Sequence, residues 1–320
     1  MILVGGENLI DFIQVKNDDG GAPLYRANVG GSPFNTTKAL ARQGMSVGYL
    51  TPISSDTMGD LLADDLKKEG VELLAPRRTE PTSLAVVSLV SGSPSYQFYR
   101  ENTAERIVTL DGLRAQLPKG VATAFQLGSL AITHGGDADA WADFYVEMKT
   151  AGLFTSLDPN IRPAFIHDRE GFLSRLMRLL QNTDLLKLSD EDLEWIYPGE
   201  SLFTAAEKLK QNSSANLVVV TLGADGAFAI FGNRTIIIKP APVDGLVDTV
   251  GAGDTFMATL ISSLFQTGRL SAAALQAMSE SDVELLLKRS SCAAALNCEH
   301  AGCNPPNLRA LDAAYPVKMT

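Results

Sequence analysis

The chain is poor in cysteine, has no cluster of basic residues and lacks a long apolar stretch. Only three of its 320 residues are cysteines, too few and too unevenly placed for a disulfide framework. The formal net charge is −10, which argues against a nucleic-acid partner. No apolar run reaches the roughly 18 residues of a membrane span, and no leader-like segment opens the chain. We therefore expect a cytoplasmic protein that binds neither nucleic acid nor membrane.

The cysteines lie close together near the end of the chain. Cys292, Cys298 and Cys303 are separated by five and four intervening residues, with His300 between the last two. Zinc sites usually contain tight C-x-x-C pairs, which this spacing does not provide. We interpret the three residues as reduced thiols, some of them buried.

Short apolar, β-branched runs alternate with helical periodicity along most of the chain. Hydrophobic residues make up 45% of the sequence and charged residues 20%, which is typical of a globular protein with a sizeable core. The alternation predicts an α/β fold in which a central, mostly parallel sheet has helices on both faces. With no linker or repeat, residues 1–320 are expected to form one domain. The expected strands are 2–4, 47–51, 124–127, 154–157, 185–188 and 217–221, and the expected helices are 34–43, 59–68, 138–150, 170–180, 202–210, 255–266 and 282–297.

Two segments break this alternation. Residues from about 9 to 29 and from about 81 to 102 contain strand-like residues with no helix between them. They are expected to form a small discontinuous β-sheet, either an ordinary extension of the fold or a lid over a site at the sheet edge.

The most informative segment runs from Asp248 to Phe256 and contains Gly251-Ala252-Gly253-Asp254. Glycines permit positive φ and close approach of the backbone, and the first amides of the following helix lack intrahelical partners. Such a turn can bind phosphate oxygens. Asp254 would then stand where a substrate hydroxyl meets phosphorus and could act as its base. The alternative is that Asp254 only caps the helix.

A second glycine turn precedes the helix expected at 34–43. It reads Gly30-Gly31-Ser32-Pro33-Phe34-Asn35, with Ser32 as the expected N-cap and Pro33 at the first helical position. The segment has neither the Walker A spacing nor G-x-G-x-x-G, which argues against a dinucleotide-dependent oxidoreductase. Close backbone approach and the Asn35 amide would suit a polyhydroxylated ligand, although Asn35 could also lie at the surface.

Together these two segments resemble the paired signatures of the ribokinase/PfkB family of carbohydrate kinases, in the same order and over essentially the whole chain. The resemblance implies a ribokinase-like fold and transfer of the γ-phosphoryl group of ATP to a small sugar, with Mg²⁺ accompanying the nucleotide. It assigns the anion hole to Gly251, Ala252 and Gly253 and the role of base to Asp254.

The resemblance also implies sugar contacts. Asp11 corresponds to the acidic residue after the first strand, while Gly31 and Asn35 belong to the first signature. Phe98 and Arg100 would close over the sugar from the lid, and Arg162, in a D-x-N-x-R segment, would meet sugar or phosphate. Lids in the family often pair across a homodimer, so a dimer is expected.

The resemblance also implies contacts with the nucleotide and with metal ions. The resemblance places Lys187, Thr221, Gly223, Gly226, Ala293 and Asn297 around ATP. Asp192 takes the place of a residue linked indirectly to magnesium, but Ser189-x-x-Asp192 departs from the usual N-x-x-E. Asp248 and Val250 would provide a monovalent-cation site, with K⁺ as the candidate.

The segments around Glu7, Tyr96 to Arg100, Gly128 to Leu130 and Asp158 to Arg162 look most like bacterial fructokinases. Fructose, phosphorylated at a primary hydroxyl, is therefore the expected substrate. The alternatives are 2-keto-3-deoxygluconate, another sugar or a nucleoside. A sugar-sensing protein on a kinase scaffold is the non-enzymatic alternative, but such a protein would be expected to lose Asp254 or the glycine turn.

Overall fold

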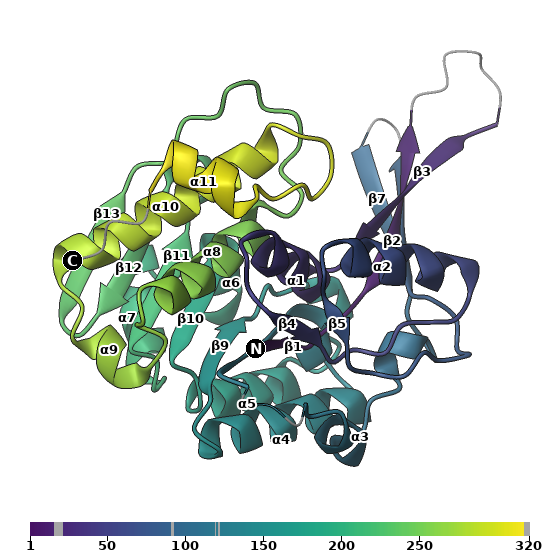
Figure 1. Ribbon diagram of the computed structural model, residues 1–320, viewed down its shortest axis with the longest axis horizontal. Helices are drawn as coiled ribbons and strands as arrows, with labels where there is room; N and C mark the ends of the chain where they lie inside the picture. The colour runs from purple at the N-terminus through teal and green to yellow at the C-terminus, as the bar shows by residue number, and fades with distance from the viewer. Residues whose placement is uncertain (16–21, 91–92, 119, 121, 317–320) are drawn as a thin grey trace.

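A computed structural model describes residues 1–15, 22–90, 93–118, 120 and 122–316. It contains a large sheet of nine strands between two layers of helices, and a small four-stranded sheet that projects from one end (Figure 1). The α/β fold expected from the sequence is confirmed. Among the described residues, no helix combines the length and the hydropathy needed to cross a membrane.

The large sheet has the order β13-β12-β11-β10-β9-β8-β1-β4-β5. All neighbours are parallel except β12 and β13, which add an antiparallel hairpin at one edge. This hairpin was not predicted. The strands are β1 (Ile2–Val4), β4 (Val47–Tyr49), β5 (Glu72–Leu73), β8 (Ala124–Gly128), β9 (Phe154–Asp158), β10 (Leu185–Ser189), β11 (Leu217–Thr221), β12 (Ala227–Phe231) and β13 (Arg234–Ile238).

Helices cover both faces of the large sheet, as the near-continuous apolar strands require. In Figure 1, α3, α4 and α5 lie on one side, and α1, α8 and α10 on the other. The helices are α1 (Ser32–Arg42), α2 (Thr57–Lys68), α3 (Leu110–Ala115), α4 (Gly136–Thr150), α5 (Arg169–Leu180), α6 (Asp190–Ile196), α7 (Leu202–Gln211), α8 (Ala252–Gln266), α9 (Ala272–Gln276), α10 (Glu280–Cys298) and α11 (Leu308–Ala314), with short 3-10 turns η1 (Ala104–Arg106), η2 (Ser129–Ile132), η3 (Pro163–Phe165) and η4 (Gly223–Asp225).

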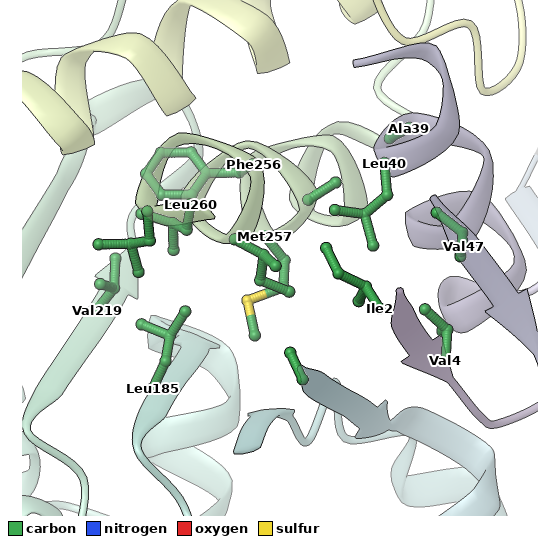
Figure 2. Packing of buried hydrophobic residues seen from close by; sticks show 14 of the residues in the cluster. Ile2, Val4, Ala39, Leu40, Val47, Leu185, Val219, Phe256, Met257 and Leu260 are labelled. Carbon is green, nitrogen blue, oxygen red and sulfur yellow. The ribbon is translucent and has the colours of Figure 1, made fainter. Parts of the chain in front are cut away.

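Two hydrophobic cores result, one on each face. Successive strand residues point to opposite sides, so Val219 of β11 joins one core while Val218 and Val220 join the other. In the first core, Met257 and Leu260 of α8 pack over the strands (Figure 2). The amino-terminal end of α8 is therefore held firmly at the carboxyl edge of the parallel strands, where ligands bind in such sheets.

The small sheet is built from the two segments that broke the alternation. Its order is β3-β2-β6-β7, with β2 (Leu9–Val15), β3 (Leu24–Gly30), β6 (Leu84–Val90) and β7 (Ser93–Tyr99). The two hairpins are antiparallel within themselves and joined by a parallel pairing of β2 with β6. The sheet rises beside α1 and α2 (Figure 1). Its strand β3 leads directly into Gly31, and Leu9 at the start of β2 pairs with Gly30.

The prediction that Ser32 caps α1 is wrong. The helix begins at Ser32 itself, its N-cap is Gly31 with φ of 108°, and no side chain caps it. Ser32 is instead used elsewhere: its hydroxyl donates to Asp254 and its amide to Glu7.

Candidate active site

Asp254 lies in the first turn of α8, facing the first turn of α1. Its Oδ1 accepts a hydrogen bond of 2.6 Å from the Ser32 hydroxyl, and its Oδ2 accepts one of 2.8 Å from the Asn35 amide. Asp254 is only 7% exposed. The two glycine segments, more than 200 positions apart in the sequence, therefore meet through this carboxylate.

Asp254 is not the N-cap of α8, so that alternative is wrong. Gly251 occupies the N-cap in the left-handed region, with φ of 76°, and Asp254 is the third helical residue. Burial raises the pKa of Asp254 above its ordinary value, while bonds from Ser32 and Asn35 act in the opposite direction. The charges of Lys187 and Arg162 also favour the ionised form.

Neighbouring atoms lie so close to Gly251 and Gly253 that there is little room for a side chain at either position. A Cβ at Gly251 would lie 2.4 Å from Sγ of Cys303. A Cβ at Gly253 would lie 3.0 Å from Nζ of Lys187. The amides at the start of α8 lack intrahelical acceptors, and a lysine ammonium lies close beside them, so the turn combines two features that favour an anion.

Lys187 forms a buried ion pair with Asp158, from the neighbouring strand β9. Its Nζ lies 2.9 Å from Asp158 Oδ2, and the two side chains are 6% and 3% exposed. Burial raises the pKa of Asp158 to about 6 even though Lys187 favours its ionised form. Burial alone would lower the pKa of Lys187, but the charges of Asp158, Asp192 and Asp254 raise it, so the ammonium stays charged beneath the glycine turn.

Glu7 is a further buried acid that the sequence did not single out. Its Oε1 accepts from the amide of Ser32 at 3.0 Å, and its Oε2 from the amide of Leu130 at 3.1 Å. Burial raises its pKa to about 7, although Arg100 acts in the opposite direction. Glu7 therefore fastens the start of α1 to the turn after β8.

Asp11 and Asn35 lie around the glycine pair of the first segment. A Cβ at Gly30 would lie 2.5 Å from Asp11 Oδ2, and one at Gly31 would lie 2.7 Å from the carbonyl oxygen of Glu7. Burial raises the pKa of Asp11 to about 6. Asn35 Oδ1 is buried and has no hydrogen-bond partner among the described residues. The segment thus provides the acceptors that ligand hydroxyls would need.

Phe98 and Arg100 reach this region from the small sheet. Phe98 of β7 packs edge-on against Phe165 of η3, with 4.5 Å between ring centroids. Arg100 is 4% exposed and pairs with Glu105 at 2.8 Å, which leaves Nη1 as its buried, unpartnered nitrogen within the described chain. The aromatic pair therefore joins the small sheet to the segment after β9; nothing in the sequence alone marked Phe165.

Arg162 is exposed, and its Nη1 donates to the backbone carbonyls of Ile161 and Asn160, at 3.2 Å and 3.4 Å. Its charge acts on Asp254. Among the cationic side chains predicted to contact a ligand, Arg162 is exposed, whereas Arg100 and Lys187 are buried.

Comparison with known proteins agrees with this geometry. The family model described as pfkB family carbohydrate kinase matches residues 1–310. The chain belongs to the pfkB family of carbohydrate kinases. It is therefore a phosphotransferase that acts on a sugar, as the paired glycine segments predicted.

Individual relatives of this pfkB kinase include two bacterial enzymes. The chain is 36% identical to a fructokinase of Rhizobium leguminosarum bv. trifolii over 271 residues, which cover 82% of this chain and 79% of that one. It is 29% identical to a 2-dehydro-3-deoxygluconokinase of Bacillus subtilis (strain 168), with 81% of each covered. Among solved structures, a fructokinase with bound ATP from Xylella fastidiosa superposes with a TM-score of 0.83 at 26% identity, covering 98% of both chains.

The predicted nucleotide residues of this pfkB kinase lie along the same sheet edge. Thr221 ends β11, Gly223 begins η4 with φ of 54°, and Gly226 follows η4 with φ of 101°. A Cβ at Gly226 would lie 2.2 Å from the carbonyl oxygen of Ile238, so only glycine fits there. These features describe a tight backbone loop after β11.

The predicted adenine residues on α10 are more deeply buried than an open pocket requires. Ala293 and Asn297 are both 0% exposed. Asn297 donates to the carbonyl of Val250 at 2.8 Å and accepts from the amide of Asn304 at 2.9 Å. A cavity of about 680 Å³ adjoins the same helix, lined in part by Cys292 and by Pro240, Pro242, Ser291 and Ala295, and none of these was predicted to bind the nucleotide.

The predicted metal residues present oxygen atoms, the donors that hard cations prefer. Asp248 accepts from the amides of Val250 and Gly302 at 3.0 Å and 2.8 Å, and the Val250 carbonyl accepts from Asn297. Asp192 accepts from the amides of Ile161 and Ser189 at 2.7 Å and 2.9 Å, so both of its oxygens are already engaged. Within the described ranges, no three His, Cys, Asp or Glu side chains are grouped to hold a metal.

The cysteines are free thiols in the structure, with Cys298 buried and the other two partly buried. Cys303 lies against Gly251, and burial raises the pKa of its thiol. Its contact with the glycine turn could not be inferred from spacing.

Proposed function

We propose that this pfkB kinase phosphorylates a primary hydroxyl of fructose, with Asp254 as the catalytic base. The observation that carries the proposal is the position of a buried carboxylate between the Gly251-Ala252-Gly253 turn, on its own helix, and the sugar-site candidate Asn35, which donates to it. The substrate follows from the fructokinase relatives, one of them 36% identical to this chain.

In phosphoryl transfer the protein contributes mainly by positioning the reactants and stabilising charge, and it forms no covalent bond with them. Asp254 takes the proton of the sugar hydroxyl, the sugar oxygen bonds to the γ-phosphorus, and the bond from phosphorus to the bridging oxygen of ADP breaks. The glycine turn and Lys187 stabilise the negative charge on the transferring group. Mg²⁺, bound with ATP, would offset phosphate charge, with Asp192 acting on it through water. Asp248 and Val250 are the residues that would hold K⁺.

The small sheet is proposed as a lid over the sugar. Phe98 and Phe165 support this role because their contact joins β7 to the segment that carries Arg162. Edge strands such as β3 invite pairing with another chain, so we also propose a homodimer through the lid. The dependence on ATP is consistent with a cytoplasmic enzyme.

A second substrate, 2-keto-3-deoxygluconate, has one specific observation in its favour. The exposed guanidinium of Arg162 would suit a carboxylate, and the Bacillus subtilis relative is named for that activity.

A panel of sugars tests both proposals. The purified enzyme is given ATP and fructose, 2-keto-3-deoxygluconate, ribose or glucose, and ADP release is followed with a coupling enzyme. We expect the highest kcat/KM for fructose. Negligible turnover of fructose beside efficient turnover of another sugar would refute the substrate assignment while leaving the kinase assignment intact.

A further inference from the structure

Ser32 is linked on two sides at the entrance of α1. Its hydroxyl donates to Asp254 Oδ1 at 2.6 Å, and its amide donates to Glu7 Oε1 at 3.0 Å. Glu7 is itself fixed by its other oxygen, which accepts from the amide of Leu130. The chain Leu130–Glu7–Ser32–Asp254 therefore connects the turn after β8 to the carboxylate on α8.

A helix cap does not explain the Ser32 hydroxyl, because Gly31 is the N-cap of α1 and no side chain caps that helix. The hydroxyl points away from its own helix to a carboxylate on another. Hydrogen bonds to an ionised acceptor are the strong ones, and they favour the charged form over the protonated one.

We propose that Ser32 is a positioning residue for the base: its hydroxyl orients Asp254 and keeps the carboxylate ionised, and Glu7 holds Ser32 in place to do so. This inference rests on the proposed role of Asp254. Asn35 shares the task, because its Nδ2 donates to Oδ2 of Asp254. Its own Oδ1 has no partner among the described residues and remains available for the substrate, whereas Ser32 has no such second role in the arrangement described.

Groups other than Ser32 also affect the pKa of Asp254, and their effects are present in every variant whose pH profile is measured. Burial opposes ionisation, and the nearby cations favour it. The charged or titratable groups that act on Asp254 include Lys187 of β10, Asp158 at the end of β9, Arg162 after β9 and Cys303 after α10. Glu7, whose pKa is raised to about 7, is linked to Asp254 through Ser32. Ser32→Ala keeps all of these groups and the backbone amide that donates to Glu7, so a shift in the pH profile can be assigned to the lost hydroxyl.

The test compares pH profiles of kcat/KM for the wild type, Ser32→Ala and Ser32→Thr. Without the hydroxyl, the acidic limb should move to higher pH by roughly one unit, and kcat at pH 7 should fall about tenfold, the effect of one hydrogen bond to a charged group. Ser32→Thr keeps a hydroxyl and should restore the wild-type limb. KM for ATP should not change in either variant.

The matched control is Ser263→Ala, on the same helix as Asp254. Ser263 is buried, and its hydroxyl has no partner among the described residues. This variant should keep the wild-type profile. Glu7→Gln should move the limb in the same direction as Ser32→Ala, and the double variant should move it less than the sum of the two shifts, because both act through one link.

The outcomes separate this inference from the proposed function. If Asp254→Asn is inactive but Ser32→Ala keeps the wild-type limb, or changes only KM for the sugar, the positioning role is refuted. Full turnover by Asp254→Asn would refute the assignment of the base instead. Thermal unfolding of Ser32→Ala shows whether this variant has a folding defect. If Ser32→Ala does not fold, the pH profile of kcat/KM for Ser32→Thr provides the test.

Discussion

Nζ of Lys187 lies 2.9 Å from Oδ2 of Asp158, and almost no solvent reaches either group. Removing one partner of a buried pair leaves an uncompensated charge, typically at a cost of about 3–5 kcal/mol. We expect Lys187→Met to lower the free energy of unfolding by that order, measured by urea denaturation. Lys187→Met with Asp158→Leu should recover much of the stability but not the activity, because the positive charge beneath the glycine turn is still missing. Recovery of both would show that the pair is purely structural.

Asp254→Asn tests the base directly. Loss of a general base typically lowers the rate by about 10²–10⁴-fold. We expect kcat to fall within that range, while ATP binding measured by calorimetry remains close to wild type. Asp64→Asn, at an exposed position of α2, is the matched control and should leave kcat unchanged. An Asp254→Asn enzyme within twofold of the wild type would contradict the mechanism.

Gly251 and Gly245 form a matched pair for testing the turn. Both have φ near 80°, but a Cβ at Gly245 would meet nothing within 4 Å, whereas one at Gly251 would lie 2.4 Å from Sγ of Cys303. Gly245→Ala should therefore cost only the backbone strain of about 1–2 kcal/mol. Gly251→Ala should be less stable than Gly245→Ala and should also lower kcat at least tenfold. Equal effects of the two substitutions on kcat would refute a special role of the turn.

Asp11 makes stability depend on pH. Its pKa is about 6 in the folded chain, against an ordinary 3.8, so the folded state binds more protons between about pH 4 and 6. Stability therefore falls as pH rises through this window, and the full penalty of roughly 2–3 kcal/mol is present above it. Asp11→Asn cannot ionise and should be more stable than the wild type at pH 7.5, with the gap closing near pH 4. Urea unfolding across this range checks the sign, and sugar turnover should be lost in the same variant.

Phe165→Ala tests the contact between the two sheets. Losing the edge-on pair with Phe98 should raise KM for the sugar about tenfold and leave KM for ATP unchanged. Phe265→Ala, at a position that is 44% exposed on α8, is the control. A change confined to KM for ATP would argue against Phe165 at the sugar side.

Local signals in the sequence were sufficient for the seven helices of ten or more residues, most strands and the glycine turn, but the short helices α3, α6, α9 and α11 were not predicted. The turn before Asp254 could be predicted because its chemistry is contained in consecutive residues. The hairpin β12–β13 was missed because no helix or strand was assigned between residues 221 and 255, although Gly232-Asn233 between two apolar runs is a recognised hairpin signal.

The remainder of the site depends on contacts between distant residues. Ser32 looked like a helix cap because its local pattern is typical of one, and only the approach of α8 shows that the hydroxyl serves Asp254. The segment around Glu7 pointed to a class of relatives but not to a role for its side chain, and Phe165 gave no local signal, since their contacts depend on Leu130 and Phe98 respectively. Burial, which raises the pKa of Glu7 and Asp11, is likewise a property of the assembled chain.

The passage from β3 into α1 takes a single residue, Gly31, between Gly30 and Ser32. The small sheet is therefore joined to the rest of the chain directly beside the proposed sugar site. A rotation about this point would carry the far ends of β2 and β3 through a wide arc while Asp11, Gly31 and Asn35 scarcely move. Binding of the sugar and exclusion of water could thus be adjusted independently. The residues around Gly31 would set the first, and the lengths of β2 and β3 would set the second.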